Sequence, residues 1–449
     1  LGERFGTSDT FSVVERLLLF LKRAQPALLT GGIHTPNHRW VMASALAKME
    51  ELFGGTAFRK RAFQFLDEGL DVTEYGEWTE RSNGTYNAVC AYYLYTVGTT
   101  FEYEPALDAS RRTLEMMRYM LHPGDTIATE YSGRQDLNTI VRFNDHYYVS
   151  YHLYANYYQD PGLAEMARVA ARTAPRGSLA LIHHMLMPEK MKLPDSGDQA
   201  PDVYTILYGG DRTVPVQQDV WYNRKHFEHP FGASVLRHRR GKLSVTAMAG
   251  QNSILYVQYG SARMVGLRLA AGWFGIGSVA FPGIRQVSED TYRAEITLRG
   301  SYFQPLPPEL HRAADGVYVD MPNDRRERSN IVELEVAVEF RLHEDGVDLR
   351  VVSGNRKNIY LQVVAMFDPA GRLEGDSLVD AVPGLRRLTS GAAVYTMDGD
   401  FIRIEEGADE HKEAVMRNET VNRDALNLAI NLKTPTDRWI KIRCGRTAK

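Results

Sequence analysis

The sequence predicts a multidomain α and β protein in which a helical N-terminal half is followed by a β-rich C-terminal half. With 449 residues the chain is longer than one ordinary core requires, so two or three domains are expected. In the first half, apolar residues recur at the spacing of an amphipathic helix. In the second half they alternate with polar residues, which is typical of strands that bury one face.

The first half is predicted to consist of consecutive helices joined by short turns. Phe53-Gly54-Gly55 and His122-Pro123-Gly124-Asp125 are two of these turns. Because consecutive helices with short links are antiparallel neighbours, this half should be a set of helical hairpins. The predicted helices cover residues 9–24, 36–53, 56–72, 85–98, 105–121, 145–158, 161–173 and 176–187.

The second half is predicted to form antiparallel sheets that stack on each other. Residues 331–342 alternate apolar and polar side chains throughout, and Glu344-Asp345-Gly346 then turns into a second strand at 347–351. Further strands are predicted at 243–248, 254–259, 358–367, 392–396 and 400–405. Proline and glycine are frequent near the middle of the chain, which predicts a linker at 196–215 between domains 1–195 and 216–449.

Composition and charge argue against several classes of protein. A formal net charge of −3 is unlike that of a nucleic-acid binder, whose domain carries a basic excess. No apolar run has the length of a transmembrane helix. Cys90 and Cys444 are the only cysteines, which excludes a disulfide scaffold and a cysteine zinc cluster. The chain begins at Leu1 without a signal-like segment, which is compatible with removal of a leader or an upstream domain.

The segment Thr35-Pro36-Asn37-His38-Arg39 is predicted to begin a helix and to carry chemistry. Thr35 is a good N-cap, and Pro36 suits the first helical position. Asn37 and His38 would then lie in the first turn, where free backbone N–H groups and the helix dipole favour an anion. The same positive end disfavours an imidazolium, so we expect His38 to stay neutral and able to accept a proton. An anion site beside a neutral base suits chemistry next to a carboxylate.

Two further helix starts and one polar loop are predicted to join this segment. Ser82 or Asn83 can cap a helix whose first turn holds Tyr86, and Asn144 or Asp145 can cap one that begins near His146. The loop 129–136 is rich in groups that bind sugars or carboxylates. If alternate helices begin at the same rim, all of these residues converge on one cleft. The catalytic candidates are Asn37, His38 and Tyr86, and the substrate-binding candidates are Trp78, Arg81, Asn83, Tyr131, Arg134, Gln135 and His146.

Each of these residues also has a purely structural interpretation. Asn37 can simply cap its own helix, Tyr86 can fill a core, and Arg81 or Arg134 can form a surface ion pair. Near the start of the β-rich half, His226 and His229 are candidate metal ligands together with a distant acid. Histidines at the start of a strand can equally be structural.

With these residues in hand, the chain resembles the heparinase II/III-like polysaccharide lyases and their alginate-lyase relatives. In that superfamily an Asn-His pair on one inner helix precedes a tyrosine in a Ser-Pro-x-Tyr-His-like segment. Here the pair is Asn37-His38 and the tyrosine is Tyr86. Asn83-Gly84 stand where Ser-Pro is usual, and Asn87 replaces the usual histidine. The resemblance is concentrated in residues 35–40, 77–87 and 130–136.

The resemblance implies an incomplete (α/α) toroid of helical hairpins followed by a C-terminal antiparallel β-sandwich. It implies β-elimination in an acidic polysaccharide, which is a glycosaminoglycan, alginate or another glucuronate-containing glycan, and a 4,5-unsaturated uronate as product. It also implies a secreted or periplasmic protein whose chemistry needs no cofactor, in which any divalent metal (Zn, Mn or Ca) is structural and bound in the β-domain. No nucleic acid and no membrane span are expected, and the oligomeric state stays open.

The resemblance also assigns roles to residues. Asn37, helped by the N–H groups of the helix start, would bind the uronate carboxylate and stabilise the enolate-like intermediate. His38 or Tyr86 is the base, and Tyr86 protonates the departing O4. To serve as a base the phenol needs an adjacent cation, Arg81 or Arg134. The arginines would also hold uronates or sulfates in flanking subsites.

Two other functions compete with the lyase. A glycoside hydrolase needs two carboxylic acids across the cleft, and the chain offers Glu77, Glu80, Glu130 and Asp136. Hydrolysis would not leave the unsaturated uronate that elimination leaves. A non-catalytic acidic-glycan-binding protein would keep the cleft and bind such glycans without turning them over.

Overall fold

The protein divides into two compact units, residues 1–201 and residues 202–449. The computed structural model describes residues 8–173, 177–197, 199–219, 230–312 and 315–447. Within these ranges, no helix has the length and apolar character needed to cross a membrane.

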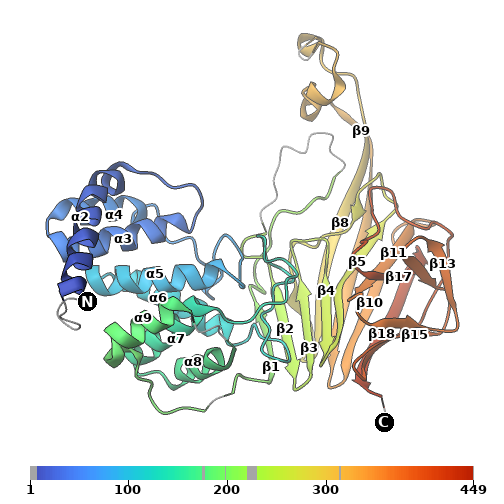
Figure 1. Ribbon diagram of the computed structural model, residues 1–449. Coiled ribbons are helices and arrows are strands. Elements are labelled where there is room, and N and C mark those ends of the chain that lie inside the picture. The colour runs from blue at the N-terminus through green and yellow to red at the C-terminus, as the bar shows by residue number, and fades with distance from the viewer. Residues whose placement is uncertain (1–7, 174–176, 198, 220–229, 313–314, 448–449) are drawn as a thin grey trace. The chain divides into compact units, whose positions relative to one another are not determined.

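The first unit is built from helical hairpins, as the sequence predicts (Figure 1). Consecutive helices pack in pairs, α3 on α4, α5 on α6 and α7 on α8, while α2 packs on α3 and α4. The described helices are α2 (Ser8–Thr30), α3 (His38–Phe53), α4 (Thr56–Leu66), α5 (Tyr86–Phe101), α6 (Glu104–Met117), α7 (Asp145–Tyr158), α8 (Pro161–Thr173) and α9 (Ser178–Leu186), and the 3-10 turn η1 (Pro188–Met191) follows. Each corresponds to a predicted helix.

The start of α3 differs from the prediction. The helix begins at His38, and Asn37 rather than Thr35 is its N-cap. The backbone N–H of His38 donates to the carbonyl of Thr35, and that of Arg39 donates to the carbonyl of Pro36. Residues 35–37 therefore form a turn ahead of the helix, and its first N–H groups are already paired within that turn.

Apolar side chains of α3 to α6 form the core of the helical unit. Trp40, Leu46 and Leu94 are fully buried there, and Cys90 lies among them as a small core residue. The rings of Trp40 and Trp78 are 5.9 Å apart, which joins the loop before α5 to α3. This packing fixes the segment that precedes Tyr86, because burying aromatic rings stabilises by several kcal/mol at roughly 25 cal/mol per Å².

The strands that the structure describes in the second unit form two sheets. The larger sheet runs in the order β1, β2, β3, β4, β5, β11, β17, β14, β13, with β6 paired to β5. Its strands are β1 (Val203–Tyr208), β2 (Val235–Arg240), β3 (Leu243–Met248), β4 (Leu255–Tyr259), β5 (Ala262–Ala271), β6 (Gly277–Ser278), β11 (Tyr360–Phe367), β13 (Leu378–Val382), β14 (Leu385–Leu388) and β17 (Leu426–Lys433). Neighbours in this sheet are antiparallel except β14 and β17, which are parallel.

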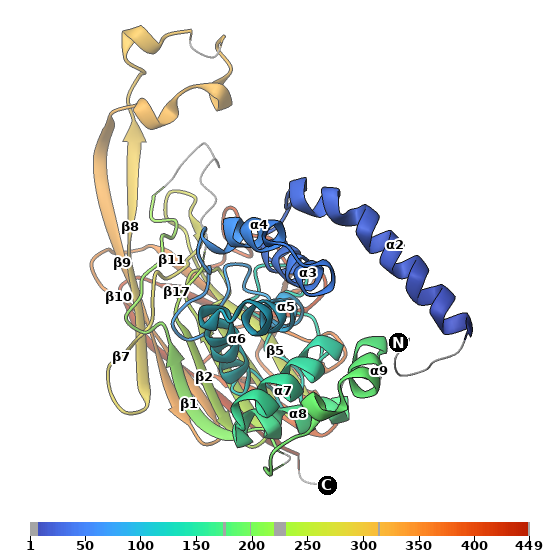
Figure 2. The same cartoon turned by 90° about the vertical axis from the view of Figure 1, so that its left-hand side faces the viewer.

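The smaller sheet runs in the order β12, β15, β16, β18, β10, β9, β8, β7, and its described pairings are antiparallel. In Figure 2, β8 and β9 extend beyond the other strands of this sheet, and residues 304–327 connect them. The strands are β7 (Arg285–Gln286), β8 (Thr291–Phe303), β9 (Arg328–His343), β10 (Gly346–Ser353), β12 (Arg372–Glu374), β15 (Ala392–Met397), β16 (Asp400–Glu405) and β18 (Thr436–Arg446), and the 3-10 turns are η2 (Pro308–Leu310), η3 (Tyr318–Asp320) and η4 (Asn323–Arg325).

The two sheets enclose one apolar core. Leu236 and Val245 of the larger sheet and Leu334 and Ile440 of the smaller sheet are fully buried in it. The fold class expected from the sequence, an incomplete (α/α) toroid of helical hairpins followed by an antiparallel β-sandwich, is confirmed. The stretch 196–215, which the sequence predicts as a linker, contains β1. That strand pairs with β2 in full register, so its ladder hydrogen bonds make residues 203–208 part of the sheet.

Candidate active site

The two polar loops that the sequence singled out are tied together by the carboxylate of Asp136. Ser82 Oγ donates to Asp136 Oδ1 at 2.9 Å, while Ser132 Oγ and the backbone N–H of Gly84 donate to Oδ2 at 3.0 Å and 2.8 Å. A Cβ placed on Gly84 would lie 3.0 Å from Asp136 Oδ2, so a larger residue would push this carboxylate by a few tenths of an ångström. The loop before α5 and the loop at 129–139 therefore act as one structure.

Three of the predicted substrate-binding residues, Arg81, Asn83 and Tyr131, are buried behind these two joined loops. Arg81 is 1% exposed, forms an ion pair with Glu77 at 3.1 Å and places its guanidinium 5.0 Å from the ring centre of Tyr131. Asn83 Nδ2 donates to the carbonyl of Ala128 and to Tyr131 Oη, both at 2.8 Å. Burial raises the pKa of Tyr131 far above its usual range. These side chains do not reach solvent, so they support the site and do not line it.

Trp78 does not have the expected role in substrate binding, whereas for His146 that role stays a prediction. Trp78 is buried against Trp40 in the helical core. His146 lies in the first turn of α7, as predicted, because Asn144 Oδ1 caps that helix by accepting from the backbone N–H of Tyr147. Its ring packs edge-on against Tyr92 of α5 at 5.4 Å, and burial lowers the pKa of His146.

A solvent-accessible group forms around Tyr86, which begins α5 as predicted. Ser82 Oγ accepts from the backbone N–H of Tyr86 at 3.2 Å and so satisfies one group of the helix start. Gln135 Nε2 donates to Tyr86 Oη at 2.9 Å. The guanidinium of Arg134 lies 5.1 Å from the ring centre of Tyr86. Tyr86 and Arg134 are half-buried and Gln135 is exposed, so this group faces solvent.

Glu80 connects the Tyr86 group to Asn37. Arg134 Nη1 lies 3.4 Å from Glu80 Oε1. On the other carboxylate oxygen, Glu80 Oε2 accepts from Asn37 Nδ2 at 2.7 Å and from the backbone N–H of Asn37 at 3.1 Å. The anion predicted at this helix start is thus present in the structure, but it belongs to the protein itself.

His38 follows directly after Asn37 and is exposed. Its Nδ1 lies 3.4 Å from the backbone N–H of His34 and accepts from it, which assigns the ring proton of a neutral His38 to Nε2. Asn37 and Tyr86 therefore belong to one neighbourhood, in which Glu80 and Arg134 link them, whereas the ring of His38 contacts His34.

The acids that a glycoside hydrolase would use are all buried and paired. Glu77 pairs with Arg81, and Glu130 lies 3.1 Å from His122 Nε2. Asp136 accepts three hydrogen bonds from the loops, and Glu80 is held by Asn37. Two carboxyl groups that face each other across an open cleft are therefore not found among these four candidates, which disfavours the hydrolase.

The predicted metal ligands His226 and His229 lie outside the described residues. Within the part of the chain that the structure describes, His, Cys, Asp and Glu side chains form no group of three that could hold a metal ion. A metal in the β-domain thus stays a prediction from the resemblance.

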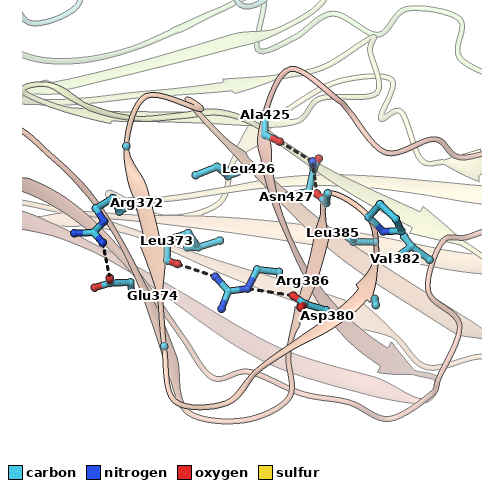
Figure 3. Close-up of a pocket in the computed structure, with 15 residues that line it drawn as sticks. Arg372, Leu373, Glu374, Asp380, Val382, Leu385, Arg386, Ala425, Leu426 and Asn427 are labelled. Carbon is cyan, nitrogen blue, oxygen red and sulfur yellow. Dashed lines mark hydrogen bonds and ion pairs between the residues drawn. The ribbon is translucent and has the colours of Figure 1, made fainter.

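The sheet unit has a cavity of its own, at the edge of the sandwich (Figure 3). It has a volume of about 1060 Å³ and lies between β12 and the β13–β14 pair. Arg386 donates to the carbonyl of Leu373 at 2.8 Å and lies 3.7 Å from Asp380. Glu374 and Asp380 also line the cavity, so its walls carry both carboxylates and guanidinium groups.

The sequence did not single out one cluster of tyrosine and histidine side chains in the helical unit. His183 Nε2 of α9 lies 3.4 Å from Tyr92 Oη of α5, and His184 Nε2 lies 2.7 Å from Tyr148 Oη of α7. His183 and His184 are adjacent in the sequence, whereas their partners come from helices that are distant along the chain. These contacts attach α9 to the rest of its unit.

Comparison with known proteins finds no matching family model and no matching curated protein. Among solved structures, heparan sulfate lyase HepC from Pedobacter heparinus is similar over 97% of this chain and 64% of that one, with 10% identity and a TM-score of 0.49. The chondroitin AC lyase of Streptomyces coelicolor A3 is similar over 94% and 62%, with 12% identity and a TM-score of 0.49. A beta-arabinopyranosidase matches over 46% of this chain, with a TM-score of 0.22. This chain therefore spans less than two thirds of the length of the two lyases.

Proposed function

We propose that this protein is a polysaccharide lyase that cleaves an acidic, uronic-acid-containing polysaccharide by β-elimination. The observation that carries the proposal is the solvent-facing group of Tyr86, Arg134 and Gln135, linked through Glu80 to Asn37 and its neighbour His38. A phenol, a guanidinium and an imidazole supply a proton donor, an anion ligand and a base. Elimination at a uronate needs these three groups and no redox cofactor.

The carboxylate ligand in this proposal is Arg134 in place of the side-chain amide of Asn37. Both N–H groups of Asn37 Nδ2 are used inside the protein, one by Thr35 Oγ1 at 3.1 Å and one by Glu80 Oε2 at 2.7 Å. Arg134 keeps about a third of its side chain exposed and has five N–H donors in total. A guanidinium can pair with a uronate carboxylate through two parallel hydrogen bonds and so favour the enolate-like intermediate.

Tyr86 is the acid in this proposal. Gln135 donates to Tyr86 Oη, so the hydroxyl oxygen accepts one hydrogen bond and its own O–H remains a donor for the glycosidic O4. His38 or Tyr86 removes the C5 proton. The electron pair of that C–H bond forms the C4–C5 double bond as the C4–O4 bond breaks, and O4 takes the proton of Tyr86. The products are a 4,5-unsaturated uronate and a new reducing end on the sugar that keeps O4.

An ultraviolet assay of the unsaturated product across a panel of acidic polysaccharides tests this function. We expect Tyr86→Phe to lower kcat by at least ~100-fold, because general acid catalysis contributes that much or more. We expect Tyr157→Phe, which alters an exposed tyrosine on α7, to leave the rate unchanged. Unchanged rates for both Tyr86→Phe and His38→Ala would contradict the mechanism, and hydrolysis products without ultraviolet absorption would favour the hydrolase.

A further inference from the structure

Glu80 occupies the position in which a substrate carboxylate would be expected. Its side chain is 4% exposed, and its two oxygens contact different donors of the site. Oε2 accepts from the backbone N–H and from Nδ2 of Asn37, while Oε1 faces Arg134 Nη1. A helix-start N–H, an amide and a guanidinium are the donors that recognise an anion.

The orientation of the Asn37 amide depends on this carboxylate. Turning the amide over would place its oxygen 2.7 Å from Glu80 Oε2, and two acceptors without a proton between them repel each other. The amide nitrogen therefore points to Glu80 and Thr35. Through this contact Glu80 fixes the orientation of an amide that is itself buried.

The charge of Arg134 is partly compensated by the same carboxylate. Glu80 Oε1 lies 3.4 Å from Arg134 Nη1, and it has no hydrogen bond that meets ordinary geometry. A substrate carboxylate that pairs with Arg134 would therefore share the guanidinium with a second negative charge a few ångströms away. In a partly buried site, repulsion between like charges at such a distance weakens binding by about ten-fold or more.

We propose that Glu80 is a specificity-determining residue, an internal carboxylate that competes with the acid group of the substrate for Arg134. The proposal rests on the proposed function for the nature of the ligand. Its consequence is that Glu80 lowers the affinity of the site for anionic sugars while it holds Asn37 in place. Glu80→Gln keeps the acceptor for Asn37 and removes the charge that opposes the substrate.

Calorimetric titration of the full chain with a short glucuronate-containing oligosaccharide tests this inference. We expect Glu80→Gln to lower the Kd by about ten-fold. We expect Glu115→Gln to leave it within about two-fold, because this control removes one negative charge from a half-exposed ion pair with Arg111 on α6. In the background of Arg134→Gln, the gain from Glu80→Gln should disappear, since the cation for which the two carboxylates compete is then gone.

An unchanged or higher Kd for Glu80→Gln, in protein that melts at the wild-type temperature, would overturn the inference, and so would an equal gain in the Arg134→Gln background. If Glu80→Gln does not fold, Glu80→Asp provides the second variant, because the shorter side chain withdraws the carboxylate from Arg134 and should also tighten binding.

The same titrations separate this inference from the proposed function. Tighter binding by Glu80→Gln without any ultraviolet-absorbing product would support the competing carboxylate and reject the lyase. Turnover by the wild type, with the same KM in Glu80→Gln, would support the lyase and reject the competing carboxylate. Absence of binding by both proteins would reject the inference.

Discussion

Two charged clusters, one in the helical unit and one on the smaller sheet, differ in how far water reaches them. In the helical unit, Arg81 and Glu77 are paired with less than about 3% of either side chain exposed. On the smaller sheet, Arg350 contacts both Glu339 and Asp437, and about a third of Arg350 and more than half of Asp437 are exposed. The first pair is shielded from water, whereas Arg350 belongs to a solvated row in which it has two carboxylate partners.

The difference determines what a charged pair does for each unit. Removing one member of a buried pair leaves a charge that neither water nor another side chain compensates. In a solvated row, water and the remaining partners compensate the loss. The buried pairs of the helical unit therefore hold the loops around Tyr86 in place, and the row on the sheet contributes mainly to its polar surface.

The largest loss of stability is expected for Arg81→Met. The change leaves the carboxylate of Glu77 buried beside an apolar side chain, which should lower the free energy of unfolding of the helical unit by about 3–5 kcal/mol. Urea denaturation followed by the helical circular dichroism signal measures it. A loss below about 1 kcal/mol would mean that the pair is solvated, and the contrast between the two units would fail.

Acidification is expected to lower the free energy of unfolding of both units by an intermediate amount. Burial lowers the pKa of His152 in α7 to about 4, and it lowers the pKa of His238 in β2 to about 4. Between pH 6.5 and 4 the unfolded chain binds a proton at each position and the folded chain does not. Stability should therefore be constant with respect to these groups above about pH 6.5 and should fall as the pH decreases towards 4.

Each histidine should contribute about 2–3 kcal/mol to this loss of stability. Unfolding curves measured from pH 4 to pH 8 test the expectation, with His152→Gln as the variant in the helical unit and His238→Gln in the sheet unit. Each variant should reduce the pH dependence of the free energy of unfolding in its own unit and leave that of the other unit unchanged. If the free energy of unfolding changes with pH equally steeply in variant and wild type, the imidazole is solvated enough to titrate normally.

The smallest loss of stability is expected for Arg350→Met on the smaller sheet. Glu339 keeps a partner in Arg293 at 2.8 Å, and Asp437 is exposed to water. We expect the free energy of unfolding of the sheet unit to change by about 1 kcal/mol or less, with the remaining effect reduced further in high salt. A change as large as that of Arg81→Met would show that the row on the sheet acts as a buried network.

Local sequence signals predicted the elements well because their causes are local. Asn144 caps α7 by accepting from the N–H three residues further on, and this contact needs only the neighbouring chain. The alternation in 331–342 specifies β9 because one face of the strand is buried. The sequence also placed Tyr86 correctly in the first turn of α5. β8 and β5 were not predicted, and neither was the parallel pairing of β14 with β17, which depends on strands that meet only in the folded sheet.

The candidate site was predicted in part. The sequence brought forward Asn37, Tyr86, Arg134 and Gln135, which the structure joins in one neighbourhood. It also proposed Arg81 as a ligand for substrate, although Arg81 is buried against Glu77. Residue type does not reveal whether an arginine within a polar loop points outward or inward. That choice depends on packing against Tyr131, which lies far along the chain.

The sequence by itself determined the succession of helices, part of the strands, the position of Tyr86 at a helix start and the presence of polar loops beside it, because capping and periodicity act over a few residues. Only the tertiary structure decided which polar groups are buried and which meet solvent. It also decided that Glu80, 43 positions after Asn37, supplies the anion at the start of α3. Contacts of that kind depend on how hairpins pack together, and no local pattern encodes which carboxylate reaches which helix.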